Sequence, residues 1–368
     1  MKRLFTTTAV AAVGLAMLGL GTFGAAQAGE SLTVVSWGGA YTQSQIKAYH
    51  RPWEKETGNT VNSEDYSGGL AEIRAQVEAG NVTWDVIDIE TRDAVRACDE
   101  GLLEPLDHSM WPPAPDGTPA IEDFIEGTLL DCAVASIVWS TIIAYDETNP
   151  AFKDEKPKTI LDFFDTKKFP GRRALRKVPA LNLEWALMAD GVPNDKIYET
   201  LSTEAGLDRA FAKLDTIKDD MLWWEAGAQP PQMLADGEAI MVSAYNGRIF
   251  NAQNLEKKPF VIIWDGQIWD LDFYGIVKGT KKLDLALDYL TYVADTQRNA
   301  DQAKYISYGP VRKSAMALVS THAETGIDMK PHMPTAPENF TNALFNSFEF
   351  WADHSDELNE RFNAWLAK

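Results

Sequence analysis

Hydrophobic positions between residues 30 and 100 follow two alternating spacings. Short apolar runs are typical of buried strands, and apolar residues three or four positions apart are typical of helices with one packed face. The runs that predict strands cover residues 32–37, 60–62 and 84–89, and the stretches that predict helices cover 46–53, 70–77 and 91–100. Strands and helices that alternate in this way predict a parallel sheet of the α/β class.

The same reading extends to the rest of the chain and predicts two lobes. Strands are predicted at 137–145, 173–176, 239–244, 261–264 and 273–277, and helical stripes at 207–214, 283–290 and 358–366. The first and last of these strands are expected to cross between lobes. The 340 residues after position 28 are also enough for two domains. We expect residues 29–140 and 272–310 to form the first lobe, and 141–271 and 311–368 the second.

The first 28 residues have the pattern of a secretory signal peptide. Lys2 and Arg3 precede an apolar stretch at 9–23, and Ala26-Gln27-Ala28 fits the small-x-small cleavage pattern. We therefore expect cleavage near Ala28-Gly29 and a mature protein in the periplasm. The alternative is an uncleaved membrane anchor, for which the apolar stretch is short.

The acidic composition limits the classes of partner. The formal net charge is −20, and it becomes −22 when Lys2 and Arg3 are removed with the signal peptide. Nucleic acids and anionic lipid surfaces are bound through positive surface. We therefore expect neither as a partner, whereas a cationic small molecule would be attracted.

The chain has two cysteines, Cys98 and Cys132. An even number of cysteines in an exported protein favours a disulfide, and the alternative is two buried thiols. The histidines are scattered, and none has metal-ligand spacing with a cysteine. We therefore predict no metal site and no cofactor.

An enzyme is the main competing class. The sequence has no nucleophile elbow, phosphate-binding loop, HExxH motif or Cys–His arrangement. Asp270 and Asp272 lie two apart on a predicted strand, and paired acids of this kind could serve a secreted carbohydrate-active enzyme. An iron carrier would need several hard oxygen ligands, and no adjacent tyrosines are present. We predict that the protein is not an enzyme.

Several motifs together resemble a known family. They are SWGGAY, WDVIDIE, KPKTILDFFD followed by FPGRRAL, LADGEAIMVSAYNGRIF, and WDLDFYGIVKGTKK with the segment that follows it. Their order and spacing resemble periplasmic solute-binding proteins of ABC importers, most of all the spermidine/putrescine-binding family. The resemblance implies a type II-like fold, with a mixed sheet flanked by helices in each lobe and hinge strands between the lobes. It also implies a monomer that captures an amine in the interlobe cleft and delivers it to a membrane permease.

The resemblance also implies ligand contacts. Polyamine binders of this family stack aromatic rings on the methylene chain and place carboxylates at the amine ends, which is physically favourable for ammonium groups. The family positions match Trp37, Tyr41, Glu90 with Thr91, Tyr245, Asp272 and Tyr308. Trp37 is followed by Gly38-Gly39, where the backbone can approach a ligand closely, so Gly38 is included.

Other candidates come from the residues themselves. Trp223 and Trp224 are adjacent, so at most one of them can face the cleft from a strand, and we select Trp224. Asp85 and Asp88 in the WDVIDIE motif are interpreted as groups that order turns. Trp53 and Trp365 lie in helical stripes and are assigned to the core.

Two departures from the polyamine pattern leave the ligand open. Asp270 replaces a Trp, and Arg176 and Lys177 lie where polyamine binders carry acids. If these side chains face the cleft, the site has an acidic and a basic end, and it suits a zwitterion such as an amino acid or an opine-like compound. The alternative is that Arg176 and Lys177 lie on a solvated strand edge.

Overall fold

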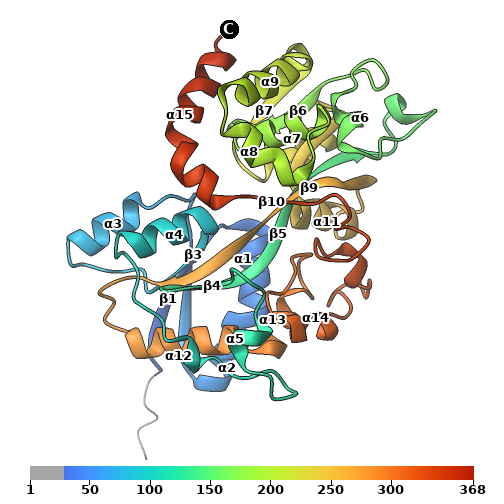
Figure 1. Ribbon diagram of the computed structural model, residues 1–368. Helices are drawn as coiled ribbons and strands as arrows, with labels where there is room; N and C mark the ends of the chain where they lie inside the picture. The colour runs from blue at the N-terminus through green and yellow to red at the C-terminus, as the bar shows by residue number, and fades with distance from the viewer. Residues whose placement is uncertain (1–28) are drawn as a thin grey trace, which may run out of the picture.

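The computed structural model describes residues 29–368, which form two lobes around one continuous sheet (Figure 1). The predicted signal peptide, residues 1–28, lies outside the described residues. Within residues 29–368, no helix combines the length and apolar character needed to cross a membrane. The strand order is β2-β1-β3-β9-β5-β8-β6-β7, with β10 beside β9 and β4 beside β5.

The first lobe contains the parallel strands that the N-terminal pattern predicts. The strands are β1 (Ser31–Ser36), β2 (Thr60–Asp65) and β3 (Val86–Glu90). The helices that accompany them are α1 (Gly39–Gln45), the π-helical turn η1 (Ile46–His50), α2 (Arg51–Thr57), α3 (Ala71–Glu78), α4 (Thr91–Asp99), α5 (Ala120–Asp123), α12 (Leu283–Val293), α13 (Thr296–Gln302) and α14 (Lys313–Leu318). The prediction of an α/β fold is therefore confirmed.

The second lobe is built in the same way. Its parallel strands are β6 (Arg173–Arg176), β7 (Met221–Trp224) and β8 (Met241–Tyr245). Its helices are α6 (Ile160–Phe164), α7 (Asn182–Ala189), α8 (Ile197–Leu201), α9 (Glu204–Asp215), α10 (Gln229–Ala235), α11 (Asn246–Asn254) and the C-terminal α15 (Phe348–Leu366). The short elements of both lobes together are β4 (Leu129–Leu130), β10 (Leu344–Phe345) and the 3-10 turns His108–Met110, Pro150–Phe152, Asn194–Lys196, Lys218–Asp220 and Lys330–His332.

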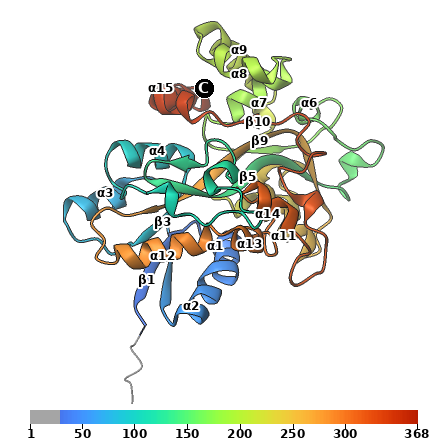
Figure 2. The same ribbon diagram turned by 60° about the horizontal axis from the view of Figure 1, so that its bottom comes forward.

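Two long strands join the lobes. The strands β5 (Ala133–Asp146) and β9 (Phe260–Ile276) pair antiparallel and run side by side from one lobe to the other (Figures 1 and 2). The prediction of separate strands at 261–264 and 273–277 is wrong, because β9 is continuous. The bend between the two halves is absorbed by a register shift opposite Thr141–Ile143 and by Gly266 with φ 78°. A bulge of this kind bends a strand without ending it.

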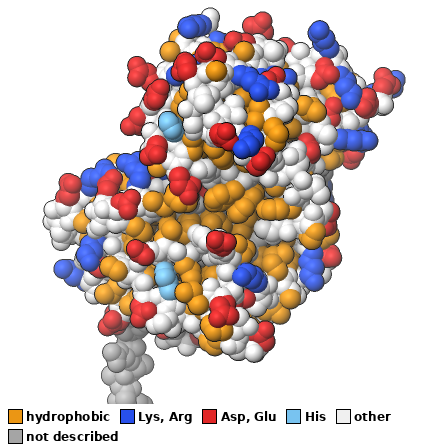
Figure 3. Space-filling view, viewed as in Figure 1, with side chains coloured by type: hydrophobic (Ala, Val, Ile, Leu, Met, Phe, Trp, Pro, Cys, Tyr) orange, Lys and Arg blue, Asp and Glu red, His pale blue; other side chains and the backbone are white. Residues whose placement is uncertain are grey.

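Each lobe has its own hydrophobic core. In the first lobe, Val34, Trp53 and Tyr274 are fully buried between sheet and helices; in the second, Leu175 and Trp185 have the same role. Trp53 and Trp365 are both buried, which confirms their assignment to the core. Figure 3 shows charged side chains spread over both lobes and hydrophobic side chains gathered where the lobes meet. The separate cores agree with the predicted two-lobed fold, although α14, within the range 311–368 expected for the second lobe, packs on α13 of the first lobe.

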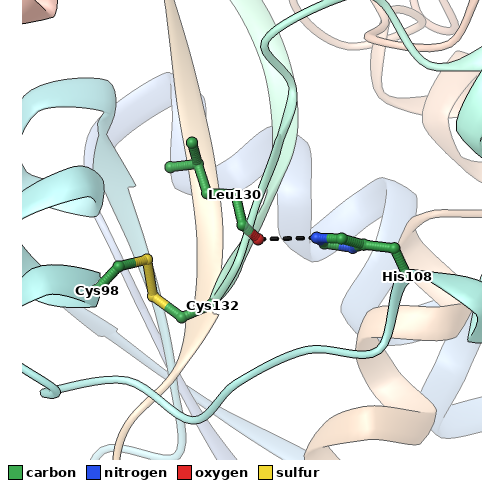
Figure 4. The surroundings of a disulfide bond; sticks show 4 residues. All are labelled: Cys98, His108, Leu130 and Cys132. Atoms are coloured by element: carbon green, nitrogen blue, oxygen red, sulfur yellow. Dashed lines mark hydrogen bonds between the residues drawn. A yellow bond between two sulfur atoms is a disulfide. The ribbon is translucent and has the colours of Figure 1, made fainter.

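The two cysteines are joined by a disulfide, as predicted. Cys98 lies near the end of α4 and Cys132 directly precedes β5, with their Cα atoms 5.6 Å apart (Figure 4). Beside the disulfide, His108 Nε2 donates a hydrogen bond to the carbonyl oxygen of Leu130 at 2.8 Å. The disulfide therefore ties a first-lobe helix to the start of β5, a strand that crosses between the lobes.

Removal of the disulfide should destabilise the protein. For a sequence separation of 34 residues, the chain-entropy model gives a contribution of about 3–4 kcal/mol. The variant Cys98→Ala/Cys132→Ala should lose about this much free energy of unfolding, measured by urea denaturation. Reductant should lower the stability of the parent protein and leave that of the variant unchanged. Equal stability of parent and variant without reductant would contradict the prediction.

Candidate ligand-binding site

A cavity of about 480 Å³ lies between the lobes. All six parallel strands contribute to it at or just after their carboxyl ends, which is where open α/β sheets bind ligands. The first-lobe and crossing-strand residues that line it are Trp37, Gly39, Tyr41, Tyr66, Ser67, Glu90, Trp139, Asp272 and Tyr308. The second lobe contributes Arg176, Glu225, Ala226, Gly227, Ala228, Tyr245 and Arg248.

The Gly-Gly pair after Trp37 shapes the first-lobe wall. Gly38 and Gly39 have φ values of 73° and 60°, a conformation that glycine adopts readily. The Gly38 amide donates to Thr42 Oγ1 at 2.8 Å and starts α1. A Cβ atom on Gly39 would lie 3.0 Å from Arg248 Nη1. The bare backbone at Gly39 therefore lets an arginine of the second lobe reach the first lobe.

Six aromatic side chains surround the cavity. The ring centroids of Trp37 and Tyr66 are 4.8 Å apart, those of Tyr41 and Tyr308 are 5.4 Å apart, and those of Trp139 and Tyr245 are 5.3 Å apart. The last two pairs meet edge to face, which is a favourable arrangement for aromatic rings. Such rings provide apolar walls for a carbon chain and faces for an ammonium group.

Carboxylates from two adjacent strands form the acidic part of the site. The register of β3 against β9 places Glu90 opposite Asp272. Asp272 is 5% exposed, and its Oδ1 accepts a hydrogen bond from Trp139 Nε1 at 2.9 Å. Burial, followed by the neighbouring Asp88, raises the pKa of Asp272 well above its usual range. A cation beside Asp272 would relieve this cost, because an opposite charge favours the ionised form.

Asp88 lies beneath this acidic part, and its interpretation as a group that orders a turn is wrong. Its side chain is fully buried, and Oδ2 accepts hydrogen bonds from Tyr41 Oη at 2.8 Å and Gln45 Nε2 at 2.5 Å. Burial raises its pKa to about 7. Asp85 does order a loop, since Thr280 Oγ1 and Lys282 Nζ both donate to its carboxylate.

Two arginines of the second lobe form the basic part of the site. Arg176 ends β6, and Arg248 lies in the first turn of α11. Within residues 29–368, neither guanidinium has an ion-pair or hydrogen-bond partner, and Arg248 Nε is buried. Each guanidinium instead lies over an aromatic ring: Arg176 over Trp224 and Arg248 over Tyr245. Unpaired buried charge is costly, so this arrangement suits an anionic ligand group.

Six of the ten predicted contacts line the cavity: Trp37, Tyr41, Glu90, Tyr245, Asp272 and Tyr308. Gly38, Lys177, Trp224 and Asp270 do not. Lys177 follows β6 and pairs with Glu225, the residue after β7, at 3.0 Å, and both side chains are exposed. Trp224 is buried behind Tyr245 and donates to Ser243 Oγ, and Trp223 packs against Phe362 and Trp365. Asp270 accepts hydrogen bonds from Thr91 and Asn346 and lines a smaller neighbouring cavity.

Sequence reasoning missed several lining residues, most importantly Arg248, Tyr66 and Trp139. Tyr66 directly follows β2 and Arg248 follows β8 by three residues, so the strand-end rule applied to every strand would have selected both. Trp139 lies in the middle of the crossing strand β5, and no local signal in the sequence marks it. In the described part of the chain, no group of three or more His, Cys, Asp or Glu residues is placed to hold a metal ion.

The chain belongs to the bacterial extracellular solute-binding proteins, whose family model matches residues 48–335. A gamma-aminobutyric acid-binding protein of Pseudomonas aeruginosa is 43% identical to it, over 96% of each chain. The solute-binding protein MotA of A. tumefaciens B6, solved in complex with glucopine, is 34% identical with a TM-score of 0.79 over 91% of this chain and 99% of that one. The Atu4243-GABA receptor is also 34% identical, with a TM-score of 0.76 over 92% and 98%.

These matches confirm the solute-binding class and the two-lobed fold of ABC importer proteins. They do not establish the finer resemblance to spermidine/putrescine binders. A spermidine/putrescine-binding protein of Streptococcus pneumoniae is 18% identical with a TM-score of 0.67, and that likeness shows the fold alone.

The buried carboxyl of Asp88 should make stability depend on pH. Its pKa is about 7 in the folded protein against 3.8 for an ordinary Asp, so between these values the folded state binds a proton that the unfolded chain releases. Stability falls with rising pH where the folded state binds more protons. The stabilisation that the raised pKa of Asp88 gives to the folded state is therefore fully present below about pH 4. It is lost as the pH rises through about 7.

The variant Asp88→Asn should show a smaller fall of unfolding free energy from pH 4 to pH 7 than the parent does. Asparagine keeps an acceptor oxygen for Tyr41 and Gln45 but does not ionise. Urea denaturation at several pH values measures the two slopes. Identical slopes would show that Asp88 ionises in the folded protein as it does in the unfolded chain.

Proposed function

We propose that this protein is the periplasmic solute-binding component of an ABC importer for a small zwitterion that carries an amine and a carboxylate. The ligand class is an ω-amino acid such as 4-aminobutanoate or a related amine–acid conjugate. The protein holds the ligand between its lobes and presents it to a membrane permease, with no chemical step on the ligand.

One observation carries this proposal: unpaired charges of both signs line one cavity. Arg176, Arg248 and Glu90 form no ion pair in the described chain, although Glu90 lies near enough to Arg176 to raise the pKa of that guanidinium. Asp272 faces the same cavity with only a neutral donor, Trp139, on its carboxylate. A polyamine would be attracted by the carboxylates but repelled by the arginines. A simple anion would be attracted by the arginines but repelled by the carboxylates. A zwitterion matches both ends of the site.

The two ends of the site belong to different lobes. The carboxylate of the ligand would be bound by the guanidinium groups of the second lobe, which can donate two parallel hydrogen bonds to a carboxylate. Its ammonium group would lie against Asp272 and Glu90 of the first lobe, with Tyr41 and Tyr308 beside it. One ligand molecule then bridges the lobes, and this favours the closed arrangement over the open one because only closure completes both contacts.

The relatives support this ligand class. The 43% identical protein is a gamma-aminobutyric acid-binding protein, and one of the solved structures is a GABA receptor. Glucopine occupies another protein of the group. A polyamine remains the weaker alternative on the charge pattern of the cavity, and no observation in the described chain favours a carbohydrate-active enzyme.

A panel of ligands should separate the alternatives. Protein refolded from denaturant, to remove carried-over ligand, should be stabilised by 4-aminobutanoate and much less by putrescine, spermidine or glucose. Ligand bound to the native state raises the melting temperature by mass action. Thermal shift at matched concentrations gives the comparison. Stabilisation by putrescine or spermidine alone would reject the zwitterionic ligand and restore the polyamine.

Charge-removing variants should identify both ends of the site. Arg176→Met, Arg248→Met and Asp272→Asn should each weaken 4-aminobutanoate binding by about 2–5 kcal/mol, the range for removing one partner of a buried charge pair. Lys177→Met is the matched control, since Lys177 is adjacent to Arg176 but lies in an exposed ion pair with Glu225. That control should bind within about 1 kcal/mol of the parent. Calorimetric titration measures all four proteins, and equal losses for Lys177→Met and Arg176→Met would remove Arg176 from the site.

A further inference from the structure

Asp88 and Asp272 form a pair of buried carboxyls in the first lobe. In the register of β3 against β9, Asp88 is opposite Tyr274 and Glu90 is opposite Asp272. Alternate residues of a strand face the same side of a sheet, so Asp88 and Asp272 are diagonal neighbours on one face. Asp88 is fully buried, Asp272 is 5% exposed, and the two carboxyls are close enough for a hydrogen bond from one to the other.

One oxygen of this pair has no partner in the described chain. Asp88 Oδ2 accepts from Tyr41 and Gln45, whereas Asp88 Oδ1 is buried and unpaired. Asp272 Oδ1 accepts from Trp139 Nε1 at 2.9 Å. Ionised carboxylates only accept hydrogen bonds, so neither of them can serve as a donor to the other. A single bound proton makes one carboxyl a donor to its neighbour, and this satisfies the unpaired oxygen.

The charges close to the pair also favour a bound proton. Burial raises the pKa of Asp272 well above its usual range, and the negative charges of Asp88, Glu90 and Asp270 raise it further. Among residues 29–368, Asp88 and Asp272 have hydrogen-bond donors but no ion-pair partner. Two like charges in one buried site disfavour each other, so one carboxyl of such a pair keeps its proton at a pH where an isolated carboxyl loses it.

The other titratable groups that face the pair keep a constant charge near neutral pH. On the first-lobe side they are hydroxyls whose pKa values are raised, first of all by burial: Tyr41, Tyr49, Tyr66, Tyr274, Tyr289 and Tyr308. From the second lobe, Arg176 and Arg248 line the same cavity as Asp272, and a guanidinium stays protonated in proteins. A change of proton binding near neutral pH is therefore expected from the carboxyls.

We propose that Asp88 and Asp272 share a bound proton in the ligand-free protein, and that the ammonium group of the ligand expels this proton when it binds. This inference rests on the proposed function and adds a regulation of the same site by pH. The ammonium group replaces the proton as the positive charge beside Asp272, so the O–H bond of the carboxyl breaks and the proton passes to water. Capture of the ligand is then favoured by rising pH, and its release by falling pH.

Calorimetric titration of the refolded mature protein with 4-aminobutanoate counts the protons. The titration is repeated at pH 7 in phosphate, MOPS and imidazole, which differ in their heats of protonation. The slope of the binding enthalpy against that heat gives the number of protons released. The carboxyl and the amine of 4-aminobutanoate ionise far below and far above this pH, so the ligand itself contributes none.

We expect release of between about half a proton and one proton for each ligand bound. Normal binding with a slope of zero, or with uptake of protons, would overturn the shared proton and leave the proposed function in place. Absence of 4-aminobutanoate binding would overturn the proposed function, and the proton linkage with it.

Three variants assign the proton to the pair. Asp88→Asn removes the neighbouring negative charge from Asp272, and it should reduce the release at pH 7 at least threefold. Glu184→Gln is the matched control, because Glu184 is fully buried and burial raises its pKa to about 7, but its carboxylate lies in the second lobe with Trp351 as donor and does not line the ligand cavity. It should leave the release unchanged.

Asp270→Asn distinguishes the pair from the neighbouring buried carboxyl. Burial raises the pKa of Asp270 to about 6, but Asp270 already accepts from Thr91, the Leu271 amide and Asn346. This variant should also leave the release at pH 7 unchanged. Loss of the release in Asp270→Asn, together with full release in Asp88→Asn, would assign the proton to Asp270 and overturn the pair.

The affinity of the unmodified protein gives a measurement that needs no variant. Release of one proton for each ligand strengthens binding about tenfold for each unit of pH. Between pH 6 and pH 7, 4-aminobutanoate should therefore bind about threefold to tenfold more tightly as the pH rises. An affinity that stays constant or falls over this range would contradict the linkage.

Discussion

The antiparallel pairing of β5 with β9 is the interaction on which the rest of the structure depends. These strands carry the sheet from one lobe into the other, so both lobes share one hydrogen-bonded frame. The pairing also sets the site, because β9 carries Asp272 and β5 carries Trp139, whose indole donates to that carboxylate. A slip of either strand by one residue would turn its own side chain to the opposite face of the sheet and separate the pair. The pairing is interrupted by two register shifts, one between Ala135 and Ile137 and one between Thr141 and Ile143.

The charged groups that line the cleft lower the stability of the protein, because they have few partners of opposite charge. Asp88 and Asp272 are buried close together, Glu90 faces Asp272 across the strands, and two arginines lie unpaired on the other lobe. Such an arrangement reduces stability, since desolvated charges without partners are unfavourable. In the proposed function, a zwitterion would supply the missing partner at each end of the cleft, and a ligand group with the wrong sign of charge would be repelled.

The glycines in the walls allow this arrangement. The chain places Gly39 and Gly227 on opposite lobes around Arg248, and Cβ atoms at these positions would lie 3.0 Å from Nη1 and 3.1 Å from Nε. The guanidinium is therefore held between two stretches of bare backbone. Because arginine is long and flexible, this confinement reduces the conformational freedom that ligand binding would otherwise have to remove.

The sequence by itself indicated the α/β class, the strand–helix alternation of the first 100 residues, the disulfide and the solute-binding family. These features depend on local periodicity, on an even pair of cysteines, and on motifs that keep their spacing along the chain. The family resemblance also pointed to Trp37, Tyr41, Glu90, Tyr245, Asp272 and Tyr308, and all six line the cavity.

Only the tertiary structure decided which side chains line the cavity and which groups lie opposite them. Lys177 and Arg176 are adjacent in sequence, but Arg176 ends β6 and lines the cleft, whereas Lys177 follows the strand and forms an exposed ion pair with Glu225. Asp88 and Asp272 are far apart in the chain and meet only because β3 pairs with β9. Arg248 and Trp139 reach the cavity through the packing of one lobe against the other. Sequence patterns record which face of an element is apolar, whereas the sign of the charge that opposes each site residue is set by long-range register and packing.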